Sequence, residues 1–164
     1  MNQLFFSCLA FLEHEIRSLY DEIVEKADDP RVKLLLVNIL EETRKHERVL
    51  EQISGIYGQT YPPQMAECEE VMGRAFRDAT ESTQSLGASF RKGMPLLKIL
   101  ENLIDHEKTV GEEYLTFLHS RVALLDAKET AIRKILEYIA ADEERHQETL
   151  RLAISTLKGE KGKP

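Results

Sequence analysis

The chain has 164 residues, of which 42% are hydrophobic and 31% are charged, and it has a formal net charge of −7 with a pI near 5.3. This length suits one compact domain with a core of its own. The acidic balance, with no stripe of lysine and arginine on any helical face, argues against a nucleic-acid partner, because nucleic-acid phosphates attract basic surfaces.

Two features of the N-terminal half bear on location. The apolar run from Leu4 to Leu12 is shorter than a membrane span and has neither a basic segment before it nor a small-residue cleavage site. We therefore expect no export and no membrane partner. Cys8 and Cys68 form no Cys-x-x-Cys motif, so we expect neither a metal knuckle nor a disulfide framework. A reducing compartment and a cytoplasmic location follow from this interpretation.

The first half of the chain reads as two long helices. Apolar residues at three- and four-residue steps predict an amphipathic helix over about residues 2–27. Asp29 as N-cap and Pro30 as first helical residue then begin a second helix, which Gly55 and Gly58 end. The short link between them predicts an antiparallel hairpin.

The second half repeats this plan after a weaker stretch. Residues 57–93 read as a crossover with one short helix near 65–80, and a third long helix begins near Pro95. Asp126 and Glu129 predict a capping pair for the fourth long helix. We expect residues 158–164 to form a disordered tail. No strand pattern occurs, so we predict an all-α fold, a four-helix bundle over residues 1–157 made of two hairpins joined by one long crossover.

The two predicted hairpins are sequence repeats. The second and fourth helices align at an offset of one hundred residues, and the first and third align at an offset of ninety-four. The first offset pairs Val32 with Ile132, Leu35 with Ile135, Leu36 with Leu136, Ile39 with Ile139, His46 with His146 and Leu50 with Leu150, and the second pairs Leu9 with Leu103, Glu13 with Glu107, Ile16 with Val110 and Tyr20 with Tyr114. We infer a bundle with pseudo-twofold symmetry.

Several ionisable residues lie on the apolar faces of these helices. A buried charge without a partner is strongly unfavourable, so each of them requires an explanation. Glu143 and His146 are three residues apart and project from one face of a helix. With Glu13, His46 and Glu107 they would form one cluster at a single level of the bundle. We interpret the cluster as a metal site rather than a metal-free salt-bridge network.

Other polar residues are assigned away from the ligand set. His14 and His106 fall off the main apolar stripe and are read as flanking residues. Tyr20 and Tyr114 are core aromatics in the first place, and groups that support the ligands in the second.

These residues, and above all Asp142-Glu143-Glu144-Arg145-His146, resemble the ferritin-like di-iron carboxylate superfamily. The chain is most similar to rubrerythrin-type proteins without a rubredoxin domain, and the resemblance covers the four long helices. It implies two irons per chain. It also implies that Asp142 hydrogen-bonds an opposing ligand histidine, His46, and that Arg145 belongs to the same supporting layer. The implied ligands are Glu13, His46, Glu107, Glu143 and His146.

The chain departs from the family pattern at two positions. Thr43 stands where the family has a bridging glutamate, and its loss leaves positive charge uncompensated in the core. Three readings stay open: Glu42 turns inward as a substitute ligand or instead acts as Asp142 does, the half-site of Glu107, Glu143 and His146 binds one metal alone, or water fills the gap. Val110 stands where rubrerythrin-type proteins commonly have a further carboxylate, which weakens a peroxidase reading.

The resemblance implies oxidation of Fe(II) by dioxygen or peroxide, as a ferroxidase or peroxide scavenger. Electrons would come from an external donor, because the chain has no rubredoxin knuckle. The alternatives are a hydroxylase, for which no apolar channel is evident, and a non-catalytic bundle with a structural or regulatory role that holds one iron, another divalent metal or none. A homodimer is the habit of the family. The apolar stripe of Leu4, Cys8 and Phe11 would be its surface or a cap over the crossover.

Overall fold

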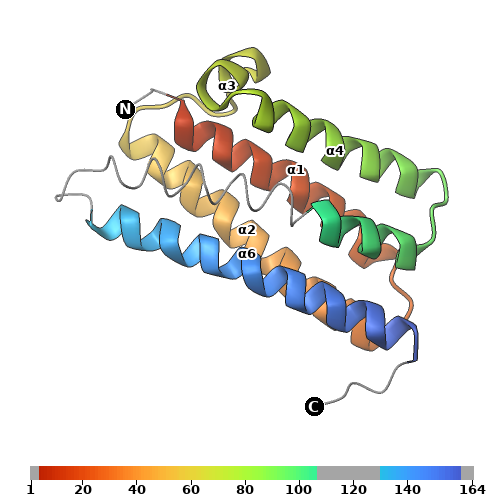
Figure 1. The fold of residues 1–164 in the computed structure, drawn as a ribbon. Helices are drawn as coiled ribbons and strands as arrows, with labels where there is room; N and C mark the ends of the chain where they lie inside the picture. Colours follow the sequence, from red (N-terminus) through yellow and green to blue (C-terminus); the bar gives the residue numbers. More distant parts are fainter. Residues whose placement is uncertain (1–3, 107–129, 160–164) are drawn as a thin grey trace.

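The computed structural model describes residues 4–106 and 130–159, and these residues contain helices and no strand (Figure 1). The predicted all-α class is confirmed. No helix in the described part of the chain combines the length and the apolar character that a bilayer span requires. The named helices are α1 (Phe5–Lys26), α2 (Pro30–Ile56), α3 (Met65–Met72), α4 (Arg74–Arg91) and α6 (Thr130–Leu157), and residues 96–106 are also helical.

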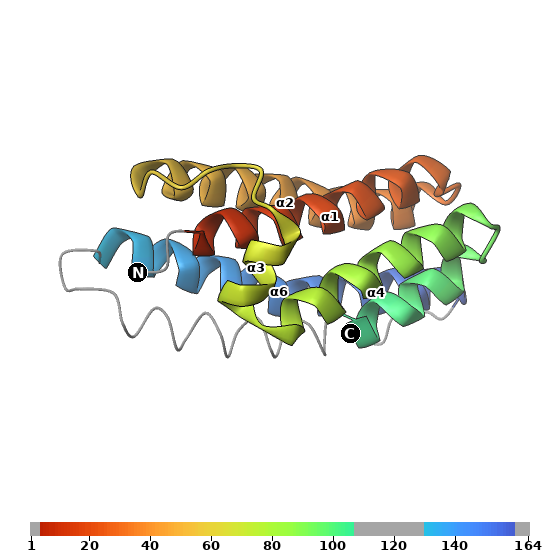
Figure 2. The same cartoon turned by 90° about the horizontal axis from the view of Figure 1, so that it is seen from above.

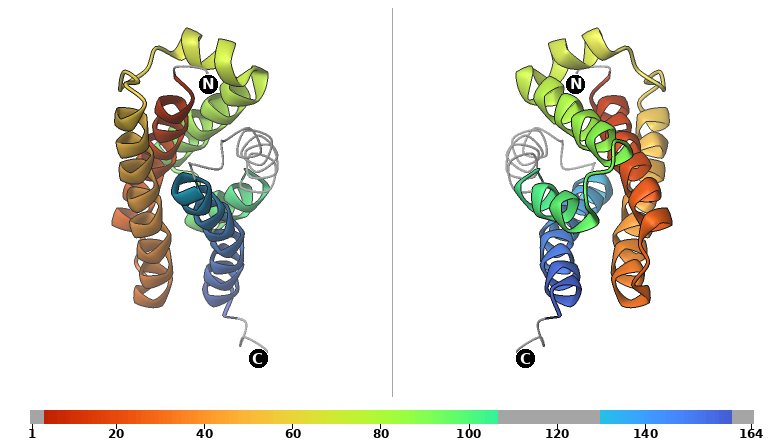
Figure 3. Two further views of the ribbon diagram at one scale, coloured as in Figure 1. Left: turned by 90° about the vertical axis from the view of Figure 1, so that its left-hand side faces the viewer. Right: turned by 90° about the vertical axis from the view of Figure 1, so that its right-hand side faces the viewer.

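The helices lie in two groups, one that contains the pair of α1 and α2 and one that contains α6 and the helix of residues 96–106. Helices α1 and α2 form an antiparallel hairpin, α6 packs against α2, and α4 lies along α1 (Figures 1 and 2). The helix of residues 96–106 lies on the α6 side of the molecule, across from the α1 and α2 pair (Figure 3). Most of the predicted third long helix, the capping pair of Asp126 and Glu129, and the tail from residue 160 lie outside the described residues. The complete four-helix bundle therefore stays a prediction.

The start of α2 agrees with the sequence pattern. The Asp29 carboxylate accepts hydrogen bonds from the backbone N–H groups of Arg31 and Val32, at 2.8 Å and 3.4 Å, and Pro30 occupies the first helical position. The Arg31 side chain also donates to Asp29. These hydrogen bonds lower the pKa of Asp29 to about 2.

We expect Asp29→Ala to lower Tm by about 3 °C, because the first turn of α2 loses its cap. A depressed carboxyl pKa means that this stabilisation is present above the ordinary value near 3.8 and is lost as pH falls through about 2. Thermal unfolding followed by circular dichroism at pH 7 and at acid pH measures both effects. Asp28→Ala changes the exposed neighbouring carboxylate and is the matched control. Equal Tm values for the two variants at pH 7 would contradict the assignment.

The other end of α2 is closed by a glycine in the left-handed region. Gly58 has φ of 65°, and Gln59 N–H and Gly58 N–H donate to the carbonyls of Ser54 and Gly55. This is the Schellman pattern, which only glycine adopts at low cost. The Gln59 side-chain oxygen in turn accepts from the backbone N–H groups of Phe6 and Ser7 at the start of α1. The end of one helix thereby caps the beginning of the other.

The predicted content of the crossover is wrong in one respect. It contains two helices rather than one short one, and α4 continues through the polar stretch Glu81–Gly87 to Arg91. Between Phe76 and Phe90 the buried face of α4 has helical spacing but small residues, and the Thr80 and Thr83 hydroxyls donate to carbonyls four residues earlier. Those hydrogen bonds satisfy the hydroxyls internally, which lets small polar residues face α1. The buried residues are Phe76, Ala79, Thr80, Thr83, Gly87 and Phe90.

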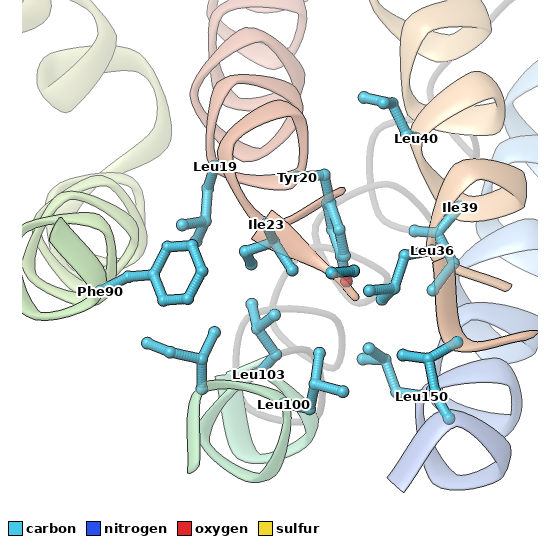
Figure 4. Close-up of a cluster of buried hydrophobic side chains, with 14 residues drawn as sticks. Leu19, Tyr20, Ile23, Leu36, Ile39, Leu40, Phe90, Leu100, Leu103 and Leu150 are labelled. Atoms are coloured by element: carbon cyan, nitrogen blue, oxygen red, sulfur yellow. The ribbon is translucent and has the colours of Figure 1, made fainter. Parts of the chain in front are cut away.

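The apolar core joins both groups of helices. In Figure 4 side chains from α1, α2, α4, the 96–106 helix and α6 converge on a common centre. Burial of such large aliphatic and aromatic side chains is the main force that holds the helices together. Tyr20, predicted as a core aromatic, has no exposed surface. The labelled residues are Leu19, Tyr20, Ile23, Leu36, Ile39, Leu40, Phe90, Leu100, Leu103 and Leu150.

The interpretation of the cysteines is also wrong. Cys8 of α1 and Cys68 of α3 form a disulfide, and neither residue has exposed surface. The expectation of a reducing compartment rested on unpaired cysteines, and the disulfide removes that reason. The disulfide also settles the position of the apolar stripe on α1, because Cys8 lies under α3 and Phe11 packs against Phe76 of α4. The crossover therefore covers Cys8 and contacts Phe11, while Leu4 and Phe11 are partly exposed and the homodimer stays a prediction.

Candidate metal centre

The predicted ligands on α1, α2 and α6 come together inside the molecule. One ligand atom from each of Glu13, His46 and Glu143 lies within 4.8 Å of the other two, and this group could hold a metal ion. Glu13 and His46 are 4% and 0% exposed, and the Glu143 side chain is 13% exposed. Each residue lies on the inward face of its helix because apolar residues three and four positions away are buried beside it.

The orientation of His46 is decided by its Nε2 atom. This atom lies 2.9 Å from Oδ2 of Asp142 on α6. A carboxylate only accepts hydrogen bonds, so His46 Nε2–H is the donor and Nδ1 carries the lone pair in the neutral imidazole. The contact between Asp142 and His46 that the family resemblance implies is therefore present.

The Nδ1 atom of His46 is the unusual atom of this site. It is buried and has no hydrogen-bond partner, although it lies 3.3 Å from Glu143 Oε1 and 3.8 Å from Glu13 Oε2. Two carboxylates facing a lone pair repel it unless a cation lies between them. A proton on Nδ1 would give ion pairs with both carboxylates at these distances. A metal ion and a proton are therefore the two cations that could lie between this atom and the carboxylates.

The distances suit a metal. Ligand atoms that each lie about 2.1 Å from one ion at tetrahedral or octahedral angles are about 3.0–3.4 Å apart. The distance between His46 Nδ1 and Glu143 Oε1 already falls in this range. The distance to Glu13 Oε2 would have to shorten by a few tenths of an ångström, which a rotation of the glutamate side chain supplies. The residues present therefore fit a divalent ion with carboxylate and imidazole ligands.

Glu143 also contacts the second predicted histidine. Its Oε2 atom lies 3.3 Å from His146 Nδ1, so its two oxygens face one imidazole each. The two histidine rings lie side by side with centroids 5.9 Å apart. Burial alone raises the pKa of Glu143, but the neighbouring imidazoles of His146 and His46 outweigh burial when they carry a proton, and then hold this pKa well below its ordinary range. A cation beside the two Nδ1 atoms, whether a proton or a metal ion, therefore keeps Glu143 ionised.

Glu42 mirrors Asp142 across the repeat. Its Oε2 atom lies 3.0 Å from His146 Nε2, as Asp142 lies against His46 Nε2. Each acid therefore holds the histidine of the opposite helix, with both Nδ1 atoms turned toward Glu143. Of the two roles considered for Glu42, the geometry favours support of a histidine over replacement of the absent bridging glutamate.

We expect Glu42→Ala to weaken metal binding by about 10- to 100-fold, because His146 loses the acceptor that fixes its tautomer and orientation. Anaerobic titration with Fe(II) measures the affinity. Glu41→Ala is the matched control, since Glu41 is the adjacent exposed carboxylate and pairs with Arg44 on the surface. If both variants bind Fe(II) like the unmodified protein, Glu42 has no role in positioning His146.

Asp142 is held by two cations as well as by His46. Lys45 Nζ lies 2.8 Å from Asp142 Oδ2, and the Arg145 guanidinium donates to the other oxygen. The residues that support the ligand histidines therefore include Arg145, as predicted, and Lys45, which was not predicted. The repeat could have identified Lys45, because it is the partner of Arg145 at the offset of one hundred residues.

Thr43 supplies no carboxylate at the position equivalent to Glu143. Its side chain is 1% exposed, and its hydroxyl donates to the Ile39 carbonyl at 3.0 Å within the same helix. The three-residue group in the described part of the chain is Glu13, His46 and Glu143. Glu107 and Tyr114 lie outside the described residues, so the half-site of Glu107, Glu143 and His146 stays a prediction.

The prediction for one further histidine is wrong. His106 was expected to flank the core, but it is 6% exposed and its side chain contacts Ser82 and Thr83 of α4. Thr83 donates its proton to Ala79 and so accepts from His106 Nε2, while Nδ1 accepts from Ser82. Burial lowers the pKa of His106 to about 4. His14, by contrast, is a flanking residue that contacts Glu47 on the surface.

Comparisons with protein-family models, with curated proteins and with solved structures gave no match to this chain.

Proposed function

We propose that this protein binds iron at Glu13, His46 and Glu143 and oxidises Fe(II) with dioxygen or peroxide, as a member of the ferritin-like di-iron group. The observation that carries the proposal is the buried His46 Nδ1 atom, which faces two carboxylates without a hydrogen bond. Imidazole nitrogen and carboxylate oxygen are both good ligands for Fe(II).

A second iron is proposed on the other side of Glu143. The second oxygen of Glu143 faces His146 Nδ1, and a carboxylate with one oxygen toward each imidazole can bridge two ions. Glu107 is the proposed remaining ligand. Because Thr43 contributes no charge, the second ion is held by fewer anions and should bind more weakly than the first.

The proposed reaction balances with iron as the substrate. Two Fe(II) ions give up two electrons, which with two protons reduce dioxygen to hydrogen peroxide or reduce hydrogen peroxide to two waters. Repeated turnover on peroxide would need an external donor to return the two electrons. The role of the protein is to hold the ions through Glu13, His46 and Glu143. Asp142 and Glu42 fix the orientation of the two imidazoles.

Anaerobic loading with Fe(II), removal of unbound metal and elemental analysis test this proposal. The expected result is more than one but fewer than two irons per chain, because the second ion binds more weakly and is partly lost with the unbound metal, and the bound iron should oxidise rapidly on exposure to oxygen. Prior loading with Zn(II), which takes similar ligands but has no redox chemistry, should suppress the oxidation. A protein that retains no metal would overturn both the site and the activity.

A single-metal, non-catalytic bundle is the second candidate. Thr43 favours this candidate, because its hydroxyl is hydrogen-bonded to the Ile39 carbonyl and cannot replace a bridging carboxylate. One iron or another divalent ion per chain, with slow or absent oxidation, is the result that this alternative predicts in the same experiment. The homodimer remains a proposal that sedimentation of the purified chain would test.

A further inference from the structure

We propose that the disulfide between Cys8 and Cys68 is a redox-dependent clamp that holds α3 on α1. Reducing it would release α3 while the hairpin of α1 and α2 stays folded. This inference does not depend on the proposed metal chemistry, because it rests on the crossover alone.

Helix α3 has little stability of its own. It runs only from Met65 to Met72, and its N-cap residue Gln64 makes no side-chain cap hydrogen bond. Isolated helices shorter than about 12–15 residues are marginal in water. Contacts with the rest of the molecule must therefore keep α3 in place.

Cys68 is the main buried anchor of this segment. Between residues 60 and 75 it is the only residue in the buried class, and it has no exposed surface. Val71 and Met72 are partly buried against the apolar cluster beneath them. The ion pair of Glu69 with Arg77 of α4 is on the surface, where such pairs contribute little.

Both ends of the segment are fixed without the disulfide. On one side Gln59 accepts hydrogen bonds from Phe6 and Ser7 of α1, and on the other side Phe76 of α4 is 2% exposed. Release of α3 would therefore leave a tethered loop between two anchors. The release should be local, since α4 keeps its buried face against α1.

The two cysteines would respond differently to reduction. Cys8 lies within α1 among buried neighbours of the apolar cluster, where a free cysteine behaves as a small hydrophobic side chain. Nothing in α1 has to move when the bond breaks. Cys68, in contrast, loses the covalent link that holds an eight-residue helix in place.

The chemistry is thiol–disulfide exchange with a dithiol reductant. A thiolate of the reductant attacks one sulfur of the pair and forms a mixed disulfide, and its second thiol then displaces the protein sulfur. Two electrons and two protons pass from the reductant, which ends as a disulfide, to Cys8 and Cys68, which end as thiols. Because neither cysteine has exposed surface, the reductant reaches a sulfur only when part of α3 opens transiently while the bond is still intact, and lasting release follows reduction.

Hydrogen exchange of the full chain, oxidised or reduced with dithiothreitol, tests the proposal. We expect amides of α3 to exchange at least ~10-fold faster after reduction, with those of residues 36–53 in α2 unchanged. Thiol titration in denaturant should find no free thiol before reduction and two after it. Cys68→Ser, kept without reductant, should reproduce the fast exchange of α3.

Three results would overturn the clamp. Free thiols in the purified, unreduced protein would show that the bond does not form. Equal exchange of α3 in the two redox states would show that other contacts hold it. Faster exchange throughout α2 after reduction would make the disulfide a staple of the whole fold and not a local clamp.

Discussion

Replacing Glu143 with glutamine is expected to weaken Fe(II) binding by at least ~100-fold, which corresponds to about 2.7 kcal/mol. Glu143 is the only described residue with one oxygen toward each of the two histidine Nδ1 atoms, at 3.3 Å in both cases. The amide keeps the size of the side chain but removes the negative charge that balances the ion. Both proposed iron positions are therefore affected at once.

The measurement is anaerobic Fe(II) titration with elemental analysis, accompanied by thermal unfolding of the metal-free protein. The matched control is Glu144→Gln, which removes the same charge from the next residue of α6, on its exposed side. The control should bind like the unmodified protein. If Glu143→Gln binds Fe(II) with unchanged affinity, the cluster of Glu13, His46 and Glu143 is not the metal site.

Replacing Thr43 with glutamate is expected to raise the iron content toward two per chain and to speed oxidation. Thr43 is buried at the α2 position equivalent to Glu143, so the new carboxylate would add the second bridging anion. The same charge should destabilise the metal-free protein by about 2 kcal/mol or more, because it enters a core that already holds Glu13 and Glu143. Iron should restore that stability.

Thr43→Gln separates charge from size. It introduces nearly the same volume without the anion, so we expect lower Tm with little recovery on adding iron. Elemental analysis and Tm, each measured with and without metal, are compared for the two variants. An iron content in Thr43→Glu no higher than in the unmodified protein would show that position 43 is not the missing ligand position.

The arrangement of the supporting residues would favour metal binding at the proposed site, even with Glu143 as its one bridging carboxylate. Asp142 and Glu42 hold the Nε2 atoms of His46 and His146, and Lys45 and Arg145 offset the charge of Asp142. These contacts cross between α2 and α6 and would orient both imidazoles before any ion arrives. An oriented ligand set loses less conformational freedom on binding.

Local features of this protein could be predicted from sequence because they depend on neighbours along the chain. The cap at Asp29 and Pro30 needs only residues within one turn of α2. The inward placement of Glu13, His46 and Glu143 follows from helical spacing relative to buried apolar residues. The contact of Asp142 with His46 was implied only by the resemblance to the di-iron family, and it is present in the structure.

Other features depended on how the helices pack, and local pattern carries little information about that. Helix α4 was underestimated because small residues, Thr83 and Gly87 among them, form its buried stripe and resemble a loop in composition. The neighbours of His106 come from a helix that the sequence did not predict at its full length.

The sequence by itself determined the all-α class, the limits of α2 and the identity of the inward carboxylates and imidazoles, because each follows from the 3.6-residue period of a helix. Only the tertiary structure decided that Glu13 and Glu143 both face Nδ1 of His46 and that Cys8 meets Cys68. Those pairings depend on the path of the crossover and on the rotation of each helix about its axis, which residues distant in sequence set jointly through packing.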